Sequence, residues 1–164
     1  MNRICIIKRL LRKFDEAESA IQRAAEGAKE SFVNHGFYAW TLENLALLRE
    51  AEGKSDDAER TYAQAVSEYE RICGFPSYEA VEALYHQSGS LLRMGRIAPA
   101  EAAIRRAITV MDKIDKLSDY EKSDYLATLA SVLESTGRHS EAAEMKTRAN
   151  QLYEHAKKQS VDQN

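Results

Sequence analysis

Cysteine is scarce in this sequence of 164 residues, and the two that occur, Cys5 and Cys73, lie far apart. Neither belongs to a CxxC pair or to a cluster of cysteine and histidine. Isolated cysteines are typical of a reducing compartment and argue against a disulfide scaffold. We therefore expect a cytoplasmic protein that binds no metal.

Long apolar runs are missing as well. The run at residues 4–7 has four residues, which is too short for the core of a signal peptide. No stretch approaches the roughly 20 apolar residues that cross a membrane. The net charge of −3 gives no strong attraction to nucleic acid. We predict neither membrane insertion nor nucleic-acid binding.

Motifs that mark common catalytic sites are also absent. The sequence has no GxxxxGK(S/T), GxGxxG, HExxH or GxSxG pattern, which excludes the usual signatures of phosphate loops, dinucleotide folds, zinc proteases and serine hydrolases. The four histidines share no spacing that would put two of them on one helical face. We predict that the protein is not an enzyme and needs no cofactor.

Helix-forming residues dominate what is present, with only 7 glycines and 2 prolines to interrupt them. An internal repeat of 42 residues organises the chain, and an earlier copy is shifted by 41. After each repeated glycine comes a short polar stretch and then an alanine. The matching positions are Gly53, Gly95 and Gly137, Ala58, Ala100 and Ala142, and Leu42, Leu84 and Leu126.

Each repeat has the pattern of two helices joined at its glycine, which tolerates the left-handed conformation past a helix end. Ser55 is the expected N-cap of the helix after Gly53, and residues 118–121 form a capping box. We predict one domain over residues 1–159, with units at about 1–35, 36–76, 77–117 and 118–159. Residues 160–164 are expected to be a disordered tail.

The pattern Leu42-x-x-Leu45-Ala46, with Gly53, Ala58, Tyr62 and Ala65, resembles the tetratricopeptide repeat, and the segment 41–59 is similar to the longer repeats of kinesin light chains. The resemblance implies an all-α, right-handed α-solenoid of about four antiparallel helix pairs. It also implies a non-enzymatic scaffold that binds a peptide or a partner protein in a concave groove. The alternative is a regulatory or sensor module of a larger signalling protein.

In this family the groove is lined by the first helix of each pair, and acids outnumber bases at the matching positions here. We therefore expect a partner segment with some basic character, anchored by Trp40 and Tyr85 and hydrogen-bonded through its backbone to Asn44. The predicted groove residues are Trp40, Glu43, Asn44, Leu47, Glu82, Tyr85, His86, Arg93, Asp124, Thr128 and Ser131.

The first 14 residues carry more apolar side chains than one buried helix face needs, whereas an end helix of a solenoid normally has a polar outer side. A homodimer could form through this edge, which includes Ile4, Ile7, Leu10 and Leu11. Three alternatives stay open. An upstream repeat covers the edge, the helix packs irregularly, or its basic residues meet an anionic membrane surface.

Overall fold

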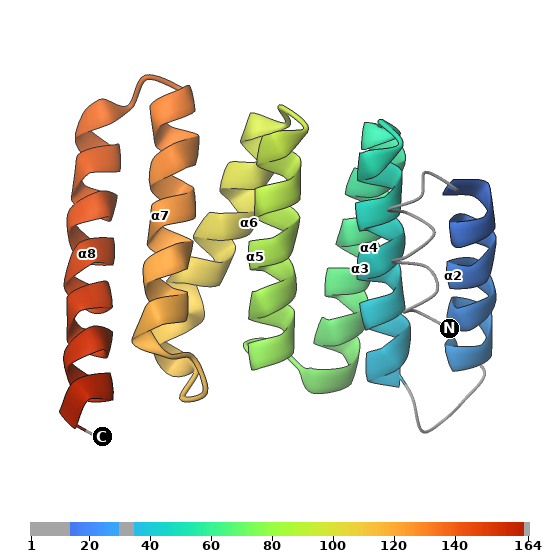
Figure 1. The fold of residues 1–164 in the computed structure, drawn as a ribbon, viewed down its shortest axis with the longest axis horizontal. Coiled ribbons are helices and arrows are strands. Elements are labelled where there is room, and N and C mark those ends of the chain that lie inside the picture. The colour runs from blue at the N-terminus through green and yellow to red at the C-terminus, as the bar shows by residue number, and fades with distance from the viewer. Residues whose placement is uncertain (1–13, 30–34, 163–164) are drawn as a thin grey trace. The chain divides into compact units, whose positions relative to one another are not determined.

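The computed structural model describes residues 14–29 and 35–162. Over these two ranges the chain forms seven α-helices, one short 3-10 turn and no strand (Figure 1). The all-α prediction is therefore confirmed. The chain divides into two compact units, the first ending at Phe75 and the second beginning at Pro76.

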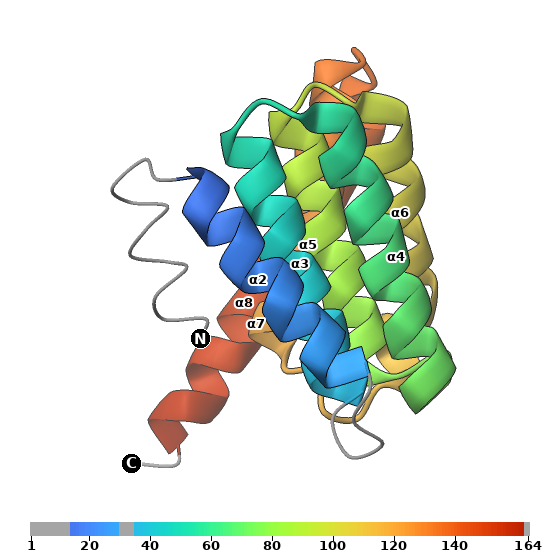
Figure 2. The ribbon, with the colours of Figure 1, turned by 90° about the vertical axis from the view of Figure 1, so that its right-hand side faces the viewer.

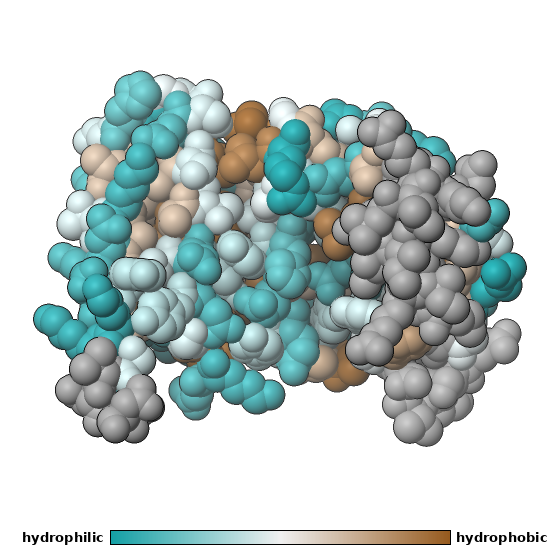
Figure 3. All heavy atoms as spheres, viewed as in Figure 1, coloured by the Kyte–Doolittle hydropathy of each residue, from teal (hydrophilic) through white to brown (hydrophobic). Residues whose placement is uncertain are grey.

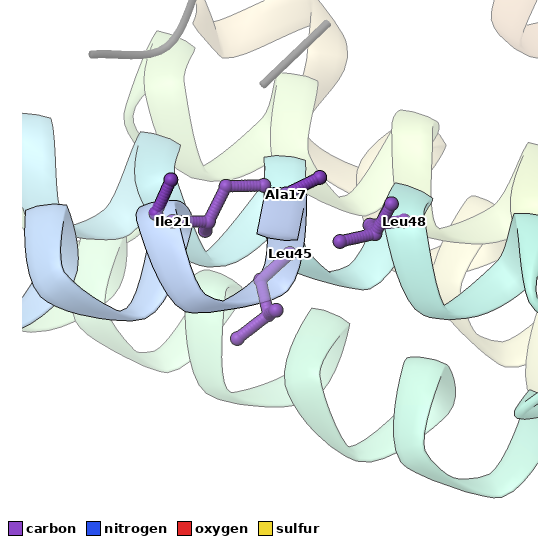
Figure 4. Close-up of a cluster of buried hydrophobic side chains, with 5 residues drawn as sticks. Ala17, Ile21, Leu45 and Leu48 are labelled. Atoms are coloured by element: carbon purple, nitrogen blue, oxygen red, sulfur yellow. The ribbon is translucent and has the colours of Figure 1, made fainter. Parts of the chain in front are cut away.

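The first unit contains α2 (Phe14–Lys29), α3 (His35–Ala51) and α4 (Ser55–Cys73). α2 packs against α3, and α3 packs against α4 (Figure 2). Ala17 and Ile21 of α2 lie in one buried cluster with Leu45 and Leu48 of α3 (Figure 4). Because the α2 residues in this seam are mostly small, the two helices can approach closely.

The second unit contains α5 (Tyr78–Arg93), α6 (Ile97–Val110), the 3-10 turn η1 (Met111–Lys113), α7 (Asp119–Ser135) and α8 (His139–Asp162). Leu91, Ala100 and Val132 form a buried cluster that joins α5, α6 and α7. α7 packs against α8, where the small residues Ala130 and Ala142 are both buried. Consecutive hairpins therefore share one core within this unit.

The three repeated glycines end their helices in the same way. Their φ angles are 78°, 73° and 75° at Gly53, Gly95 and Gly137, in the left-handed region that favours glycine. The amide of the residue after each glycine bonds the carbonyl five residues back, as between Arg138 and Leu133 at 2.9 Å. This pattern satisfies helix-end carbonyls within a very short bend, and it confirms that the three glycines occupy equivalent bends.

An ion pair recurs at equivalent repeat positions in each unit. In the first unit Lys54 Nζ lies 3.3 Å from Glu18 Oε2. In the second, Arg138 Nη1 donates to Glu101 Oε1 at 2.8 Å. Each cation directly follows a bend glycine, and each acid directly follows a buried alanine. The pair therefore ties the second helix of one hairpin to the bend of the next.

Two local predictions were wrong. Ser55 is the first residue of α4 rather than its N-cap, because the short bend after Gly53 already places Lys54 at the cap position. The predicted tail begins at residue 160, but α8 continues through Asp162 because no glycine or proline stops it.

Other local predictions are confirmed or lie outside the described residues. The Ser118–Glu121 capping box is present. The first helix expected in the unit at about 1–35 lies outside the described residues. The single domain over residues 1–159 stays a prediction.

Candidate functional site

A solvent-facing surface on two neighbouring helices of the second unit contains most of the predicted groove residues. On each helix, residues at spacings of 4, 7 and 11 fall on one stripe, and α5 and α7 lie side by side (Figure 1). Figure 3 shows that hydrophilic residues cover much of this surface. We call it the α5/α7 face, and it consists of Glu82, Tyr85, His86, Gly89 and Arg93 of α5 with Asp124, Thr128, Ser131 and Ser135 of α7.

Aromatic side chains hold the two helices together beneath this face. Tyr85 stacks on Tyr125 of α7, with ring centroids 4.9 Å apart and planes 24° apart. The Tyr125 hydroxyl donates to the Glu82 carboxylate, and the Thr128 hydroxyl bonds the Tyr85 oxygen. Tyr125 is fully buried, while Tyr85 remains half-buried. The pair therefore fixes the Tyr85 ring in one position at the surface.

Carboxylates surround these tyrosines and make this end of the face electronegative. Burial raises the pKa of the Tyr85 hydroxyl, and the negative charges of Asp124 and Glu82 raise it further. Tyr78, in the first turn of α5, donates to Glu121 at 2.8 Å, and this hydrogen bond chiefly raises the pKa of Tyr78 to about 12. These raised pKa values mean that ionising Tyr85 or Tyr78, which would add a negative charge beside the carboxylates, is disfavoured.

The opposite end of the face carries a positive charge. Arg93 lies in the last turn of α5, is exposed, and donates from Nη2 to Ser90 Oγ at 2.6 Å. Between the two ends lie His86, Gly89 and Ser131. The His86 Nε2 atom lies 3.9 Å from Glu82, and the Ser131 hydroxyl donates to the Ala127 carbonyl at 3.1 Å.

The predicted residues of the first unit lie on α3, and we call them the α3 face: Trp40, Glu43, Asn44 and Leu47. Trp40 is 39 % exposed, and its ring lies 5.5 Å from that of Phe37, which is also exposed. The Asn44 side-chain amide donates to the Trp40 carbonyl at 2.8 Å. Glu43 accepts a hydrogen bond from Tyr69 of α4 at 3.2 Å.

Within each unit, the structure brings the predicted residues together on one side of the first helices. Sequence reasoning missed Tyr125, Phe37, Gly89 and Ser135. Gly89 and Ser135 could have been found by shifting Leu47 and Arg93 by 42, whereas Tyr125 is a core residue whose contact with Tyr85 depends on helix packing. The predicted edge residues Ile4, Ile7, Leu10 and Leu11 lie outside the described residues.

The described part of the chain contains neither a cluster of metal ligands nor a membrane-spanning helix. Residues 14–29 and 35–162 contain no group of three or more potential metal ligands. In the same ranges, none of the helices combines the length and the apolar character that crossing a membrane requires.

These features define a class of protein: an all-α chain of repeated helical hairpins whose first helices present varied side chains to solvent. Residues 1–71 match the family described as tetratricopeptide repeat. The first 71 of the 164 residues are therefore similar to this family. Proteins built from such repeats bind other proteins through the extended surfaces that stacked units present.

A solved structure supports the fold. The chain aligns with BtubC (BKLC) from P. vanneervenii with a TM-score of 0.81 and 16 % sequence identity, over 94 % of this chain and 62 % of that one. This chain therefore spans less than two thirds of BtubC, and the likeness at this identity shows an α-solenoid fold alone. No curated protein matches the sequence significantly.

Proposed function

We propose that this protein is a non-enzymatic interaction module that binds a segment of a partner protein on its first helices. The α5/α7 face carries this proposal. Glu82 and Asp124 occupy equivalent positions of two repeats, as do His86 and Thr128, and all four are at least partly exposed. The core positions of the same helices, such as Leu84 and Leu126, are buried. The apolar packing between the helices therefore lies at these core positions, and the stripe keeps polar groups at the surface.

The charges on this face favour a partner with basic side chains. Glu82 and Asp124 lie beside the Tyr85 ring, so a lysine or arginine could meet carboxylates and an aromatic face together. The bond from Tyr125 orients Glu82 before any partner arrives. A preorganised site of this kind loses less conformational freedom on binding.

On the α3 face, Trp40 offers an exposed aromatic anchor in contact with Phe37. Aromatic residues with this exposure often provide much of the binding energy at interfaces. The Asn44 side-chain N–H already bonds the Trp40 carbonyl, so its carbonyl oxygen is the group we assign to a partner's backbone N–H. The backbone hydrogen bond predicted for Asn44 is therefore proposed for its side-chain oxygen alone.

A charge-reversal experiment tests the proposal. An array of peptides of about twelve residues, varied in charge, is probed with the wild-type protein, Asp124→Lys and the control Glu144→Lys. Glu144 is an exposed acid on α8, outside the face, so both variants change the net charge equally. We expect basic peptides to bind wild type and Glu144→Lys, and to lose binding to Asp124→Lys. Equal loss in both variants, or no bound peptide at all, would overturn the proposal.

Dimerisation through Ile4, Ile7, Leu10 and Leu11 is a second, separate part of the proposal, and it rests on the sequence alone. Sedimentation velocity of the full chain over a range of concentrations tests it. A protein that stays monomeric at high concentration would contradict it.

A further inference from the structure

A second surface of the second unit is equivalent to the one that receives α7. Helix α7 packs against both α5 and α6. A shift of 42 residues maps this receiving surface onto α7 and α8, which lie side by side (Figure 1). We call the shifted surface the α7/α8 edge, and it consists of six exposed residues: Tyr120, Asp124, Ala127 and Glu134 of α7 with Lys146 and Tyr153 of α8.

The receiving surface shows which groups hold a helix in this position. The Tyr78 hydroxyl donates to Glu121 of α7 at 2.8 Å. Glu82 accepts a hydrogen bond from the hydroxyl of Tyr125, which lies four residues further along α7. Tyr85 stacks on the same Tyr125 ring. A carboxylate and a tyrosine four residues apart therefore join α7 to α5 through two reciprocal hydrogen bonds and one aromatic contact.

Tyr120 and Tyr153 form an aromatic pair on the α7/α8 edge. Their ring centroids lie 5.4 Å apart in an edge-to-face arrangement, and the two residues are 39 % and 50 % exposed. The positions equivalent to Tyr153 are occupied by Tyr69 and Met111, which are only 8 % and 1 % exposed. Tyr153 therefore presents apolar area to solvent at a position that the other repeats bury.

The opposite end of the edge is adapted to water. Tyr62 and Ile104 occupy equivalent positions and are almost completely buried. Lys146 stands at the same position of α8, is exposed, and forms an ion pair with Glu134 at 2.5 Å. A whole hairpin packed over the edge would bury this ion pair, which costs free energy. The edge therefore suits a single helix that covers its aromatic end.

We infer that the aromatic end of the α7/α8 edge binds an amphipathic helix of another protein, which carries a glutamate and, four residues later, a tyrosine. Tyr120 occupies the position of Tyr78 and donates its hydroxyl to the glutamate. Asp124 occupies the position of Glu82 and accepts a hydrogen bond from the tyrosine. The small side chain of Ala127 leaves room for the tyrosine ring. This helix occupies a different surface from the segment proposed for the α5/α7 face.

The aromatic pair also has an ordinary structural explanation, because Tyr120 and Tyr153 join two helices whatever lies outside them. At the same end, Asp119 of α7 pairs with His155 of α8 at 2.5 Å. That explanation predicts an effect on stability and no preference among ligands. The contact between the rings does not need the Tyr120 hydroxyl, so Tyr120→Phe separates the two explanations.

A nuclear magnetic resonance titration of the full chain tests the inference. The probe is an alanine-rich peptide of about 18 residues, long enough to be helical, with one glutamate and a tyrosine four residues later. Two control peptides carry glutamine in place of glutamate, or the tyrosine two residues after the glutamate and so on another helical face. We expect the probe to shift amide signals around Tyr120 and Tyr153, and to bind about two- to fivefold more tightly than the glutamine peptide.

Variants of the protein connect this preference to the edge. Tyr153→Ala should weaken binding of the probe about tenfold, as the loss of an aromatic anchor does at interfaces. Tyr120→Phe should bind the glutamate and glutamine peptides equally. Gln151→Ala, at an exposed residue of α8 outside the edge, is the control and should leave the affinity unchanged.

The outcomes are distinct from those of the proposed function. The inference fails if the probe shifts no amides, if the shifts lie away from the edge, or if the preference for glutamate survives in Tyr120→Phe. Circular dichroism checks folding, and Tyr120→Phe keeps the aromatic ring should Tyr153→Ala unfold. Basic peptides bound on the α5/α7 face should bind Tyr153→Ala as they bind wild type, so either idea can fail alone.

Discussion

The ion pair between Glu101 and Arg138 makes a quantitative prediction about stability. Glu101 on α6 accepts hydrogen bonds from Arg138, in the bend before α8, and from Arg105 Nε at 2.7 Å. The hydrogen bond from Arg138 is the main reason that the pKa of Glu101 falls from 4.5 to about 2. Glu101→Gln keeps the shape of the side chain and removes its charge.

The size of the effect follows from the pKa. Each pKa unit is worth about 1.4 kcal/mol, so the fall from 4.5 to about 2 corresponds to about 3 kcal/mol without solvent screening. The Glu101 side chain is 19 % exposed and its arginine partners are more exposed still. Water therefore screens much of the interaction, and we expect Glu101→Gln to lose about 1–2 kcal/mol of unfolding free energy at neutral pH.

The pH dependence has a definite sign. Because the folded pKa of Glu101 is lowered, its stabilisation is present above about pH 4.5 and is lost as the pH falls toward 2. Urea unfolding, followed by circular dichroism, should show a gap between wild type and Glu101→Gln that closes on acidification. Glu144→Gln, at an exposed acid of α8, serves as the control and should show little gap. A gap that is absent at neutral pH, or unchanged at about pH 2, would refute the reasoning.

Two further predictions concern the bend at Gly137 and the hydrogen bond of Tyr78. Gly137→Ala should lose about 1–2 kcal/mol of unfolding free energy because φ is 75°, whereas Gly27→Ala, in a helix with open space around it, should gain up to about 1 kcal/mol. Urea unfolding measures both changes in unfolding free energy. If the two substitutions changed it in the same direction, the left-handed bend at Gly137 would not explain the loss. The pKa of Tyr78 is raised to about 12, so its stabilisation is present below about pH 10 and lost as the pH rises toward 12. Tyr78→Phe should flatten this alkaline loss in pH-dependent urea unfolding, and an unchanged slope would count against it.

The hairpins could be predicted from the sequence because each repeat contains the residues that end a helix and define its buried side. A glycine at each bend and apolar residues at helical spacing determine where a helix ends and which side is buried. Features outside the period were harder to predict. Gly74, at a left-handed φ of 79° after α4, has no counterpart in the repeat. The 3-10 end of α6 at Met111 follows three β-branched residues, which lower helix propensity.

The groove residues were predictable as positions but not as chemical groups. Spacing indicates that Glu43 and Asn44 lie on one side of α3. It does not indicate that Glu43 accepts a hydrogen bond from Tyr69, or that Asn44 donates one to the Trp40 carbonyl. Such contacts depend on helix crossing and on side-chain rotamers, which a single sequence does not specify. The sequence therefore predicted the charge of these side chains better than the hydrogen bonds that they make within the protein.

Comparing equivalent positions separates packing from recognition. Each repeat packs on neighbours that resemble one another, so packing favours the same residue in every copy. A partner protein has no 42-residue period, so its recognition favours residues that differ between copies. The bend glycines and one core leucine position are uniform, whereas the exposed stripe is varied. The uniform sets are Gly53, Gly95 and Gly137 and Leu42, Leu84 and Leu126, and the varied sets are Trp40, Glu82 and Asp124 and Ala51, Arg93 and Ser135. Asp124 lies on this varied and exposed stripe, which is why Asp124→Lys should change binding more than stability.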